Sequence, residues 1–150
     1  MDTGSFTIGA DNIRFTVPGV TLPVGYHALI QRYFHHTIPS PGEVEMAINA
    51  IEDALQAAPQ LHTTPSRTTC ADHFLKEIAT VAGVSARLTQ QDIEQVFNRV
   101  ADVIAGSPRQ PGEFPADPAF IGYLLIVREL SHHLHIQDIF LTLNQPAFDD

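Results

Sequence analysis

Residues 119–127 read AFIGYLLIV and form the most hydrophobic stretch of the chain. Asp117 and Pro118 stand just before it, where an N-cap residue and a first-turn proline begin many helices. The stretch is apolar on nearly every side, so it predicts a central, buried helix that becomes amphipathic after Arg128. At nine residues it is far shorter than the roughly 20 residues that cross a bilayer. We therefore expect a helical domain with this segment at its centre.

Four further helices are predicted from apolar residues that recur every three or four positions. They span approximately residues 24–35, 42–57, 71–82 and 89–106. Ser40, Pro41 and Glu43 fit a capping box with a first-turn proline at the start of the second helix. The segments 58–69 and 107–118 are polar or rich in proline, and their composition predicts loops.

A β-hairpin is predicted before these helices. Its strands are Ser5–Ile8 and Ile13–Val17, joined by the turn residues Gly9–Asn12. The segment 139–143 (IFLTL) predicts either a short strand beside this hairpin or a last helical turn. The expected fold class is mainly α, at the margin of α+β. It is a bundle-like single domain of about five helices over residues 1–150, with residues 1–4 and 145–150 mobile.

Composition bounds the class of protein. The 150 residues are 44% hydrophobic and 17% charged, which is typical of a globular chain. Seventeen acidic residues against eight basic ones give a net charge of −9. This charge opposes binding to nucleic acids and to anionic membranes. The single cysteine, Cys70, excludes an internal disulfide. The first residues have no signal-peptide pattern, so we expect a soluble cytoplasmic protein.

Histidines gather at the end of the central helix, where the chain reads SHHLHIQD from Ser131. On a helix, His132 and His135 share one face, and Glu129 lies three residues before His132. Glu129 and His132 therefore fit the Glu-x-x-His pattern of carboxylate-bridged metal sites. No other glutamate has a histidine three residues later, which argues against a di-iron centre. A site for a single divalent metal is the remaining metal hypothesis.

Such a site needs a further ligand, and His35 or His36 at the end of the first predicted helix could supply it. The metal would then be zinc, iron or manganese, held by Glu129, His132, His135 and His36. The competing interpretation needs no cofactor, because histidines near helix ends complement the helix dipole and cap carbonyl groups.

Two weaker candidates for catalysis are present. Cys70 at a helix start would have a lowered pKa, and His73 one turn later could accept its proton. A lone cysteine is nevertheless more often a small buried apolar residue. The string Asp2-Thr3-Gly4-Ser5 matches a short motif of aspartic proteases but also fits an exposed terminus. Phosphate-binding, serine-hydrolase and zinc-protease motifs are absent from the sequence, which lowers the expectation of an enzyme.

Three hypotheses follow from the sequence. The leading one is a non-catalytic helical protein that acts by association, either as a homodimer or with a protein partner. The alternative is a metal-binding protein or small metal-dependent hydrolase that uses Glu129, His132 and His135. The third is a pH-responsive binder, because protonation of all eight histidines would change the formal charge from −9 to −1.

Overall fold

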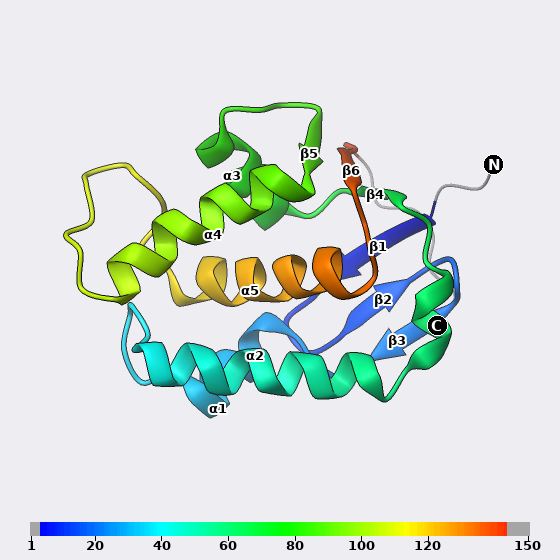
Figure 1. Cartoon of the computed structure of the whole chain (residues 1–150), viewed down its shortest axis with the longest axis horizontal. Coiled ribbons are helices and arrows are strands. Elements are labelled where there is room, and N and C mark those ends of the chain that lie inside the picture. Colours follow the sequence, from blue (N-terminus) through cyan, green and yellow to red (C-terminus); the bar gives the residue numbers. More distant parts are fainter. Residues whose placement is uncertain (1–3, 144–150) are drawn as a thin grey trace.

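A six-stranded mixed sheet and five α-helices make up residues 4–143, the part of the chain that this computed structural model describes (Figure 1). The strands are β1 (Gly4–Ile8), β2 (Ile13–Phe15), β3 (Val20–Leu22), β4 (Arg67–Cys70), β5 (Arg87–Thr89) and β6 (Asp138–Leu141). The helices are α1 (Tyr26–Tyr33), α2 (Pro41–Gln56), α3 (His73–Ala82), α4 (Gln90–Ile104) and α5 (Pro118–His133), with a short 3-10 helix, η1 (Pro59–Thr63). The prediction of a mainly α, bundle-like domain is therefore wrong, and the fold is α/β.

Strands β4 and β5 account for most of this error. β4 overlaps the end of a segment whose composition predicts a loop, and β5 falls between two predicted helices. They are four and three residues long, too short for alternation of apolar and polar residues to be recognised. In β4 the buried side chains are Thr68 and Cys70. Their burial depends on neighbouring strands that come from both ends of the chain.

The strand order is β3-β2-β1-β4-β6-β5. The predicted hairpin is confirmed, because β1 and β2 pair antiparallel with Phe6 opposite Phe15. The predicted strand at 139–143 is confirmed as β6, but it pairs with β4 and β5 and does not lie beside the hairpin. β1, β4 and β6 run parallel, so all three end at one end of the sheet. We call this the carboxyl end, and the opposite one the amino end.

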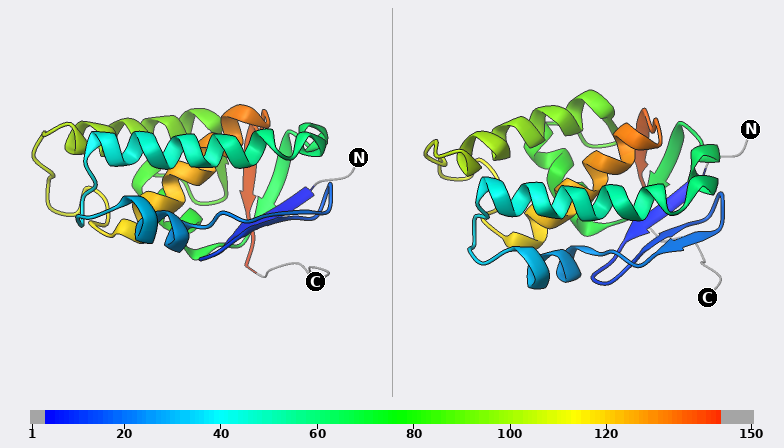
Figure 2. Two further views of the ribbon diagram at one scale, coloured as in Figure 1. Left: turned by 90° about the horizontal axis from the view of Figure 1, so that it is seen from below. Right: turned by 60° about the horizontal axis from the view of Figure 1, so that its bottom comes forward.

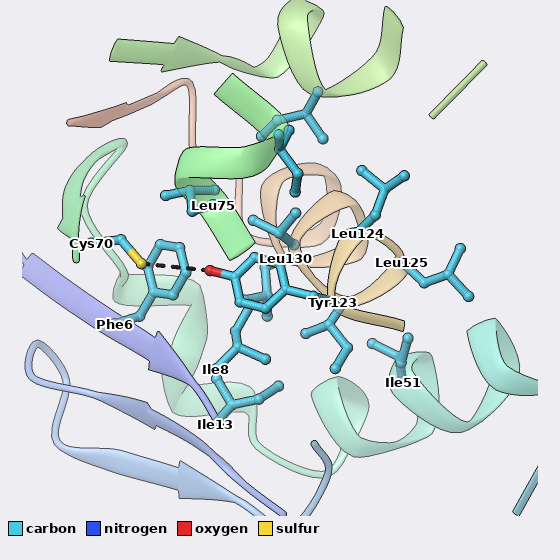
Figure 3. Close-up of a cluster of buried hydrophobic side chains, with 14 of the residues drawn as sticks. Phe6, Ile8, Ile13, Ile51, Cys70, Leu75, Tyr123, Leu124, Leu125 and Leu130 are labelled. Carbon is cyan, nitrogen blue, oxygen red and sulfur yellow. Dashed lines mark hydrogen bonds between the residues drawn. The ribbon is translucent and has the colours of Figure 1, made fainter. Parts of the chain in front are cut away.

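Helix α5 lies at the centre of the domain, as AFIGYLLIV predicts. Residues 120–127 are all buried, and the helix packs against α1, α2, α3, α4 and β1. Figure 2 shows α2 and α4 flanking it, and Figure 3 shows its side chains meeting those of β1, β2 and α2. A Cβ atom on Gly122 would lie 3.3 Å from the carbonyl oxygen of Tyr26, so this glycine lets α1 approach α5 closely. The last turn of α5 lies at the amino end of the sheet, where β6 begins.

Several sequence-based expectations fall on residues 1–3 and 144–150, which lie outside the described part. They are the mobility of the two termini and the first half of the string Asp2-Thr3-Gly4-Ser5. Its second half, Gly4 and Ser5, lies in β1. Among residues 4–143, no helix combines the length and apolar character that crossing a membrane requires.

Candidate functional site

The turn between β1 and β2 lies at the carboxyl end of the sheet and holds the start of α1. The carbonyl oxygen of Gly9 accepts a hydrogen bond from the amide of Tyr26 at 3.2 Å. The carbonyl oxygen of Ala10 accepts from the amides of His27 and Ala28 at 3.0 and 3.2 Å. The first amides of a helix have no partner within the helix, so the turn satisfies them. These three hydrogen bonds fix the turn against α1.

Gly25 makes this contact sterically feasible. Its φ of −142° and ψ of 171° are extended values that any residue adopts. A Cβ atom at this position, however, would lie 2.4 Å from the carbonyl carbon and oxygen of Ala10 and 2.5 Å from the amide nitrogen of Asp11. Glycine is therefore required by the close approach of two backbone segments rather than by an unusual dihedral angle.

Asp72 is a buried carboxylate at the same end of the sheet, just after β4. Its Oδ2 accepts hydrogen bonds from the amide of Ile8 at 2.8 Å and from the hydroxyl of Tyr123 at 2.7 Å. Its Oδ1 accepts from the hydroxyl of Thr7 at 2.5 Å. Asp72 precedes α3 but does not cap it with its side chain. The carboxylate instead joins β1 to the buried face of α5.

Cys70 extends this network, with its Sγ 3.6 Å from the hydroxyl oxygen of Tyr123 (Figure 3). Burial raises the pKa of the Cys70 thiol well above its usual range, and the negative charge of Asp72 adds to the shift. Burial likewise raises the pKa of Tyr123 well above its usual range. The shift of Cys70 is opposite to the lowering expected for a cysteine at a helix start, because the residue is the last of a buried strand.

His73, the proposed partner of Cys70, lies on the surface. Its side chain is 78% exposed, and its Nε2 pairs with Oε1 of Glu77 at 3.1 Å. The Cys70 thiol has no exposed surface and contacts Tyr123 instead. The structure therefore places the two residues in different environments, one dry and one solvated.

Charged side chains gather at the amino end, around the last turn of α5. Arg128 forms a bidentate salt bridge with Glu94, from Nε to Oε2 at 3.0 Å and from Nη2 to Oε1 at 3.2 Å. Its Nη1 also donates to Oε2 of Glu129 at 2.9 Å. The guanidinium lies 3.9 Å from the ring centre of Phe97, a cation–π distance. Arg128 is thus held by α4 while it orients Glu129.

Glu129 links Arg128 to His133. Its Oε1 lies 3.2 Å from Nε2 of His133, and the same nitrogen lies 3.1 Å from Oε2 of Glu52 in α2. Among the described residues, Glu52, Glu129 and His133 form the one group whose ligand atoms, all within 4.8 Å of one another, could hold a metal ion. The side chain of Glu129 is 5% exposed, against 41% for His133.

The other histidines proposed as ligands lie elsewhere. His132 pairs with Oε2 of Glu94 at 3.0 Å. α5 ends at His133, so His135 lies beyond the helix, with a φ of 56°. His36 pairs with Glu43 at the start of α2, about 14 Å along that helix from Glu52 at 1.5 Å per residue. The structure therefore keeps Glu129 of the predicted set and adds two neighbours that the spacing did not indicate.

The pKa values of the two glutamates around Arg128 are shifted in opposite directions. Burial raises the pKa of Glu129, only partly offset by the charges of Arg128 and His133, while the charge of Glu52 raises it further. Burial also raises the pKa of Glu94, but the hydrogen bonds and charges of Arg128 and His132 outweigh it, so the pKa lies below its usual value. Folding therefore favours the neutral form of Glu129 and the charged form of Glu94.

A surface hollow of about 490 Å³ lies between α3 and the loop before α5, away from these networks. Val81 and Phe114 contribute apolar surface, and Arg109 donates to the carbonyl of Phe114 at 3.1 Å. Neither the Asp72 network nor the Glu52–Glu129–His133 group lines it. The chemistry-bearing side chains and the hollow are thus separate features.

Several solved structures share this fold. A PPX-GPPA enzyme of Aquifex aeolicus superposes with a TM-score of 0.69 and 13% identity, over 95% of this chain and 53% of that one. A type II variant of the Aquifex aeolicus Ppx/GppA phosphatase gives 0.64 and 10%, over 93% and 52%. An exopolyphosphatase-like protein gives 0.63 and 9%, over 93% and 54%. No protein-family model matches the sequence, and no curated protein matches it either.

At this identity the likeness shows the fold alone, and the chain spans about half the length of these structures. The leading hypothesis from the sequence, a non-catalytic helical-bundle protein, is contradicted because the fold is α/β and is shared with structures named as phosphatases and related enzymes. These findings give no support to a homodimer, and association with a protein partner stays a prediction. The alternative, a metal-dependent hydrolase, agrees better with these neighbours.

Proposed function

We propose that this chain binds the phosphate group of a phosphorylated substrate at the turn between β1 and β2, as one domain of a phosphate-ester or phosphoanhydride hydrolase. The observation that carries the proposal is the superposition of 95% of the chain on a PPX-GPPA enzyme. The names of the other neighbours, a phosphatase and an exopolyphosphatase-like protein, indicate the same substrate class. The turn geometry supplies the physical support.

Two backbone amides of this turn point in the same direction. In a trans peptide, the N–H group points opposite to the carbonyl group of the preceding residue. The carbonyls of Gly9 and Ala10 both point at the start of α1. The amides of Ala10 and Asp11 therefore both point away from α1. Successive amides that converge in a turn form a concave site for anions such as phosphate.

The position of the turn supports the same substrate class. In open α/β sheets, ligands bind beyond the carboxyl ends of the strands, where the direction of the connections changes. β1 has a parallel neighbour in β4 and an antiparallel neighbour in β2, and the turn follows β1 at its carboxyl end. The carboxylate of Asp72 also holds the end of β1, through the hydroxyl of Thr7 and the amide of Ile8. The turn is thus a rigid element rather than a free loop.

Asp11 gives the proposal a sharp test, because its exposed carboxylate belongs to the turn itself. A negative charge beside an anion site weakens binding, so Asp11→Asn should tighten pyrophosphate binding by about threefold to tenfold, a change of roughly 1 kcal/mol. Gly25→Ala pushes the turn away from α1 and should weaken pyrophosphate binding at least tenfold. Gly19→Ala is the matched control, since a Cβ atom there meets nothing within 4 Å.

Isothermal titration with pyrophosphate and with tripolyphosphate measures these affinities, and circular dichroism checks that each variant is folded. Tighter binding by Asp11→Asn and weaker binding by Gly25→Ala, with the affinity of Gly19→Ala unchanged, support the site. If wild-type protein binds neither anion at millimolar concentration, or if Asp11→Asn binds no better, phosphate does not bind at this turn. Release of phosphate from polyphosphate and from p-nitrophenyl phosphate tests hydrolysis separately.

A further inference from the structure

We propose a second site, for a divalent metal ion, formed at the amino end of the sheet by Glu52 of α2 and by Glu129 and His133 of α5. It is separate from the proposed phosphate site, because α5 carries Tyr123 near the carboxyl end and His133 ten residues later. Ten residues of helix span about 15 Å. Zinc is the ion that this mixture of imidazole and carboxylate ligands suits best.

The distances from Nε2 of His133 to the two carboxylates match those between the ligands of a zinc centre. Bonds of about 2.0–2.1 Å in a tetrahedral arrangement place neighbouring ligand atoms about 3.3 Å apart. Nε2 of His133 lies 3.1 Å from Oε2 of Glu52 and 3.2 Å from Oε1 of Glu129. All three atoms lie within 4.8 Å of one another. A metal could therefore enter with small rotations of side chains and no movement of the backbone.

Arg128, next to the group, orients Glu129 for metal binding and leaves one of its carboxylate oxygens available. Arg128 contacts Oε2 of Glu129, which leaves Oε1 facing His133. Residues that hydrogen-bond to a metal ligand fix its orientation and strengthen the site. The charge of Arg128 is itself matched by Glu94. When Glu129 is deprotonated, it and Glu52 contribute two negative charges that a divalent cation would neutralise.

Access and electrostatics favour a cation at this point. The side chains of Glu52 and His133 are 34% and 41% exposed, so an ion can enter from solvent. Glu129 is nearly buried, which removes its carboxylate from competing water. With His133 neutral, the carboxylates of Glu52 and Glu129 repel one another across the imidazole. Three protein ligands leave a fourth tetrahedral position for water or a substrate atom, as in hydrolytic zinc sites.

The chain contains its own matched control. His73 and Glu77 also lie four residues apart on a helix, with Nε2 and Oε1 separated by 3.1 Å. This pair lies in α3 and is not part of a three-ligand group among the described residues. A histidine–glutamate pair on its own gives weak binding, since stable zinc sites use at least three protein ligands. His73→Ala should therefore leave zinc binding unchanged.

The experiment is a zinc titration of chelator-treated protein at neutral pH, with binding measured by isothermal titration calorimetry. We expect one zinc ion per chain, with His133→Ala and Glu52→Gln each weakening binding at least about 100-fold and His73→Ala without effect. Cobalt in place of zinc should give the visible absorption of a four-coordinate site. Zinc should also raise the melting temperature of the wild type but not of His133→Ala.

Three results would overturn the proposal: no zinc bound by wild-type protein, equal binding by His133→Ala, or equal loss in His73→Ala. If His133→Ala fails to fold, Glu52→Gln, which lies on another helix, decides instead. Failure here leaves the phosphate site untouched, because pyrophosphate titration of the Asp11 and Gly25 variants reports on the opposite end of the sheet. Zinc binding likewise does not depend on those variants.

Discussion

The two ends of the sheet hold polar groups in opposite ways. At the carboxyl end, the buried Asp72 accepts hydrogen bonds from a strand amide and two hydroxyl groups. At the amino end, six charged or ionisable side chains from α2, α4 and α5 pair where water reaches most of them. A buried group that loses its partner keeps its full desolvation cost, whereas a half-exposed group exchanges its partner for water. The Asp72 network at the carboxyl end should therefore determine stability, and the charged side chains at the amino end should be free to rearrange around a metal ion.

The strongest test of this contrast is Asp72→Ala. The change leaves the amide of Ile8 and the hydroxyl of Tyr123 without an acceptor in a dry environment. We expect the free energy of unfolding to fall by about 4 kcal/mol, since each orphaned buried group costs roughly 1–3 kcal/mol. Urea denaturation measures the loss. Glu94→Ala at the amino end is the comparison and should cost less than half as much. Equal losses would end the distinction between the two ends.

A second, smaller effect is expected for Tyr123→Phe. This substitution removes one of the donors to Asp72 and the contact with Cys70, but it keeps the aromatic ring in the core. Thr7 and Ile8 still donate to the carboxylate. We expect a loss of about 2 kcal/mol, the value of a hydrogen bond to a charged group. Thermal melting at constant pH checks it, and a loss as large as that of Asp72→Ala would show that the ring, not the hydroxyl, is critical.

Local patterns in the sequence were sufficient to predict the helices. The run at residues 119–127 gave the central helix, and Ser40 with Glu43 gave the start of α2, where both capping hydrogen bonds form. These features depend on residues within one or two turns of each other. The short strands β4 and β5 do not, because their burial comes from β1 and β6 at the far ends of the chain. The prediction of the fold class was wrong for this reason.

The residues that the structure brings together could be predicted only in part, for the same reason. Asp72 attracts notice only as a neighbour of Cys70, while its partners Thr7 and Tyr123 lie 65 and 51 positions away. Glu52 is 81 positions from His133. The helical spacing from Glu129 to His132 suggested a site, but the helix turns His132 toward Glu94 and His133 toward Glu129. Sequence spacing can select a face only within one helix.

His135 offers a gain in stability at the amino end. It follows the C-cap of α5 with a φ of 56°, and the amide of Ile136 donates back to the carbonyl of Ser131 at 3.1 Å. This is the helix ending that favours glycine, because a Cβ atom in the left-handed region costs about 1 kcal/mol. His135→Gly should raise the free energy of unfolding by about that amount, whereas His135→Ala should not. Chemical denaturation compares the two, and a loss in His135→Gly would show that the imidazole itself stabilises the turn.

The pH dependence of the amino end should centre on Glu129. Its pKa is raised in the folded state, so the folded protein holds this proton more tightly, and stability falls as pH rises above the ordinary value of 4.5. The lowered pKa of Glu94 acts in reverse, and its contribution is lost as pH falls below 4.5. In metal-free protein, Glu129→Gln should leave stability at neutral pH within about 1 kcal/mol and remove the decline above pH 4.5. Urea titrations at several pH values test this, and an unchanged decline would assign it to another group.

The smallest effect is predicted for His132→Ala. The imidazole lies 3.0 Å from Oε2 of Glu94, but the two side chains are 39% and 33% exposed, and Arg128 contacts both oxygens of the same carboxylate. We therefore expect a change within about 0.5 kcal/mol that disappears in 1 M salt. Urea denaturation with and without salt measures it. A loss as large as that of Tyr123→Phe would mean that water does not compensate for broken pairs at the amino end. The charges around Glu129 would then be needed to hold the fold and could not rearrange around an incoming metal ion.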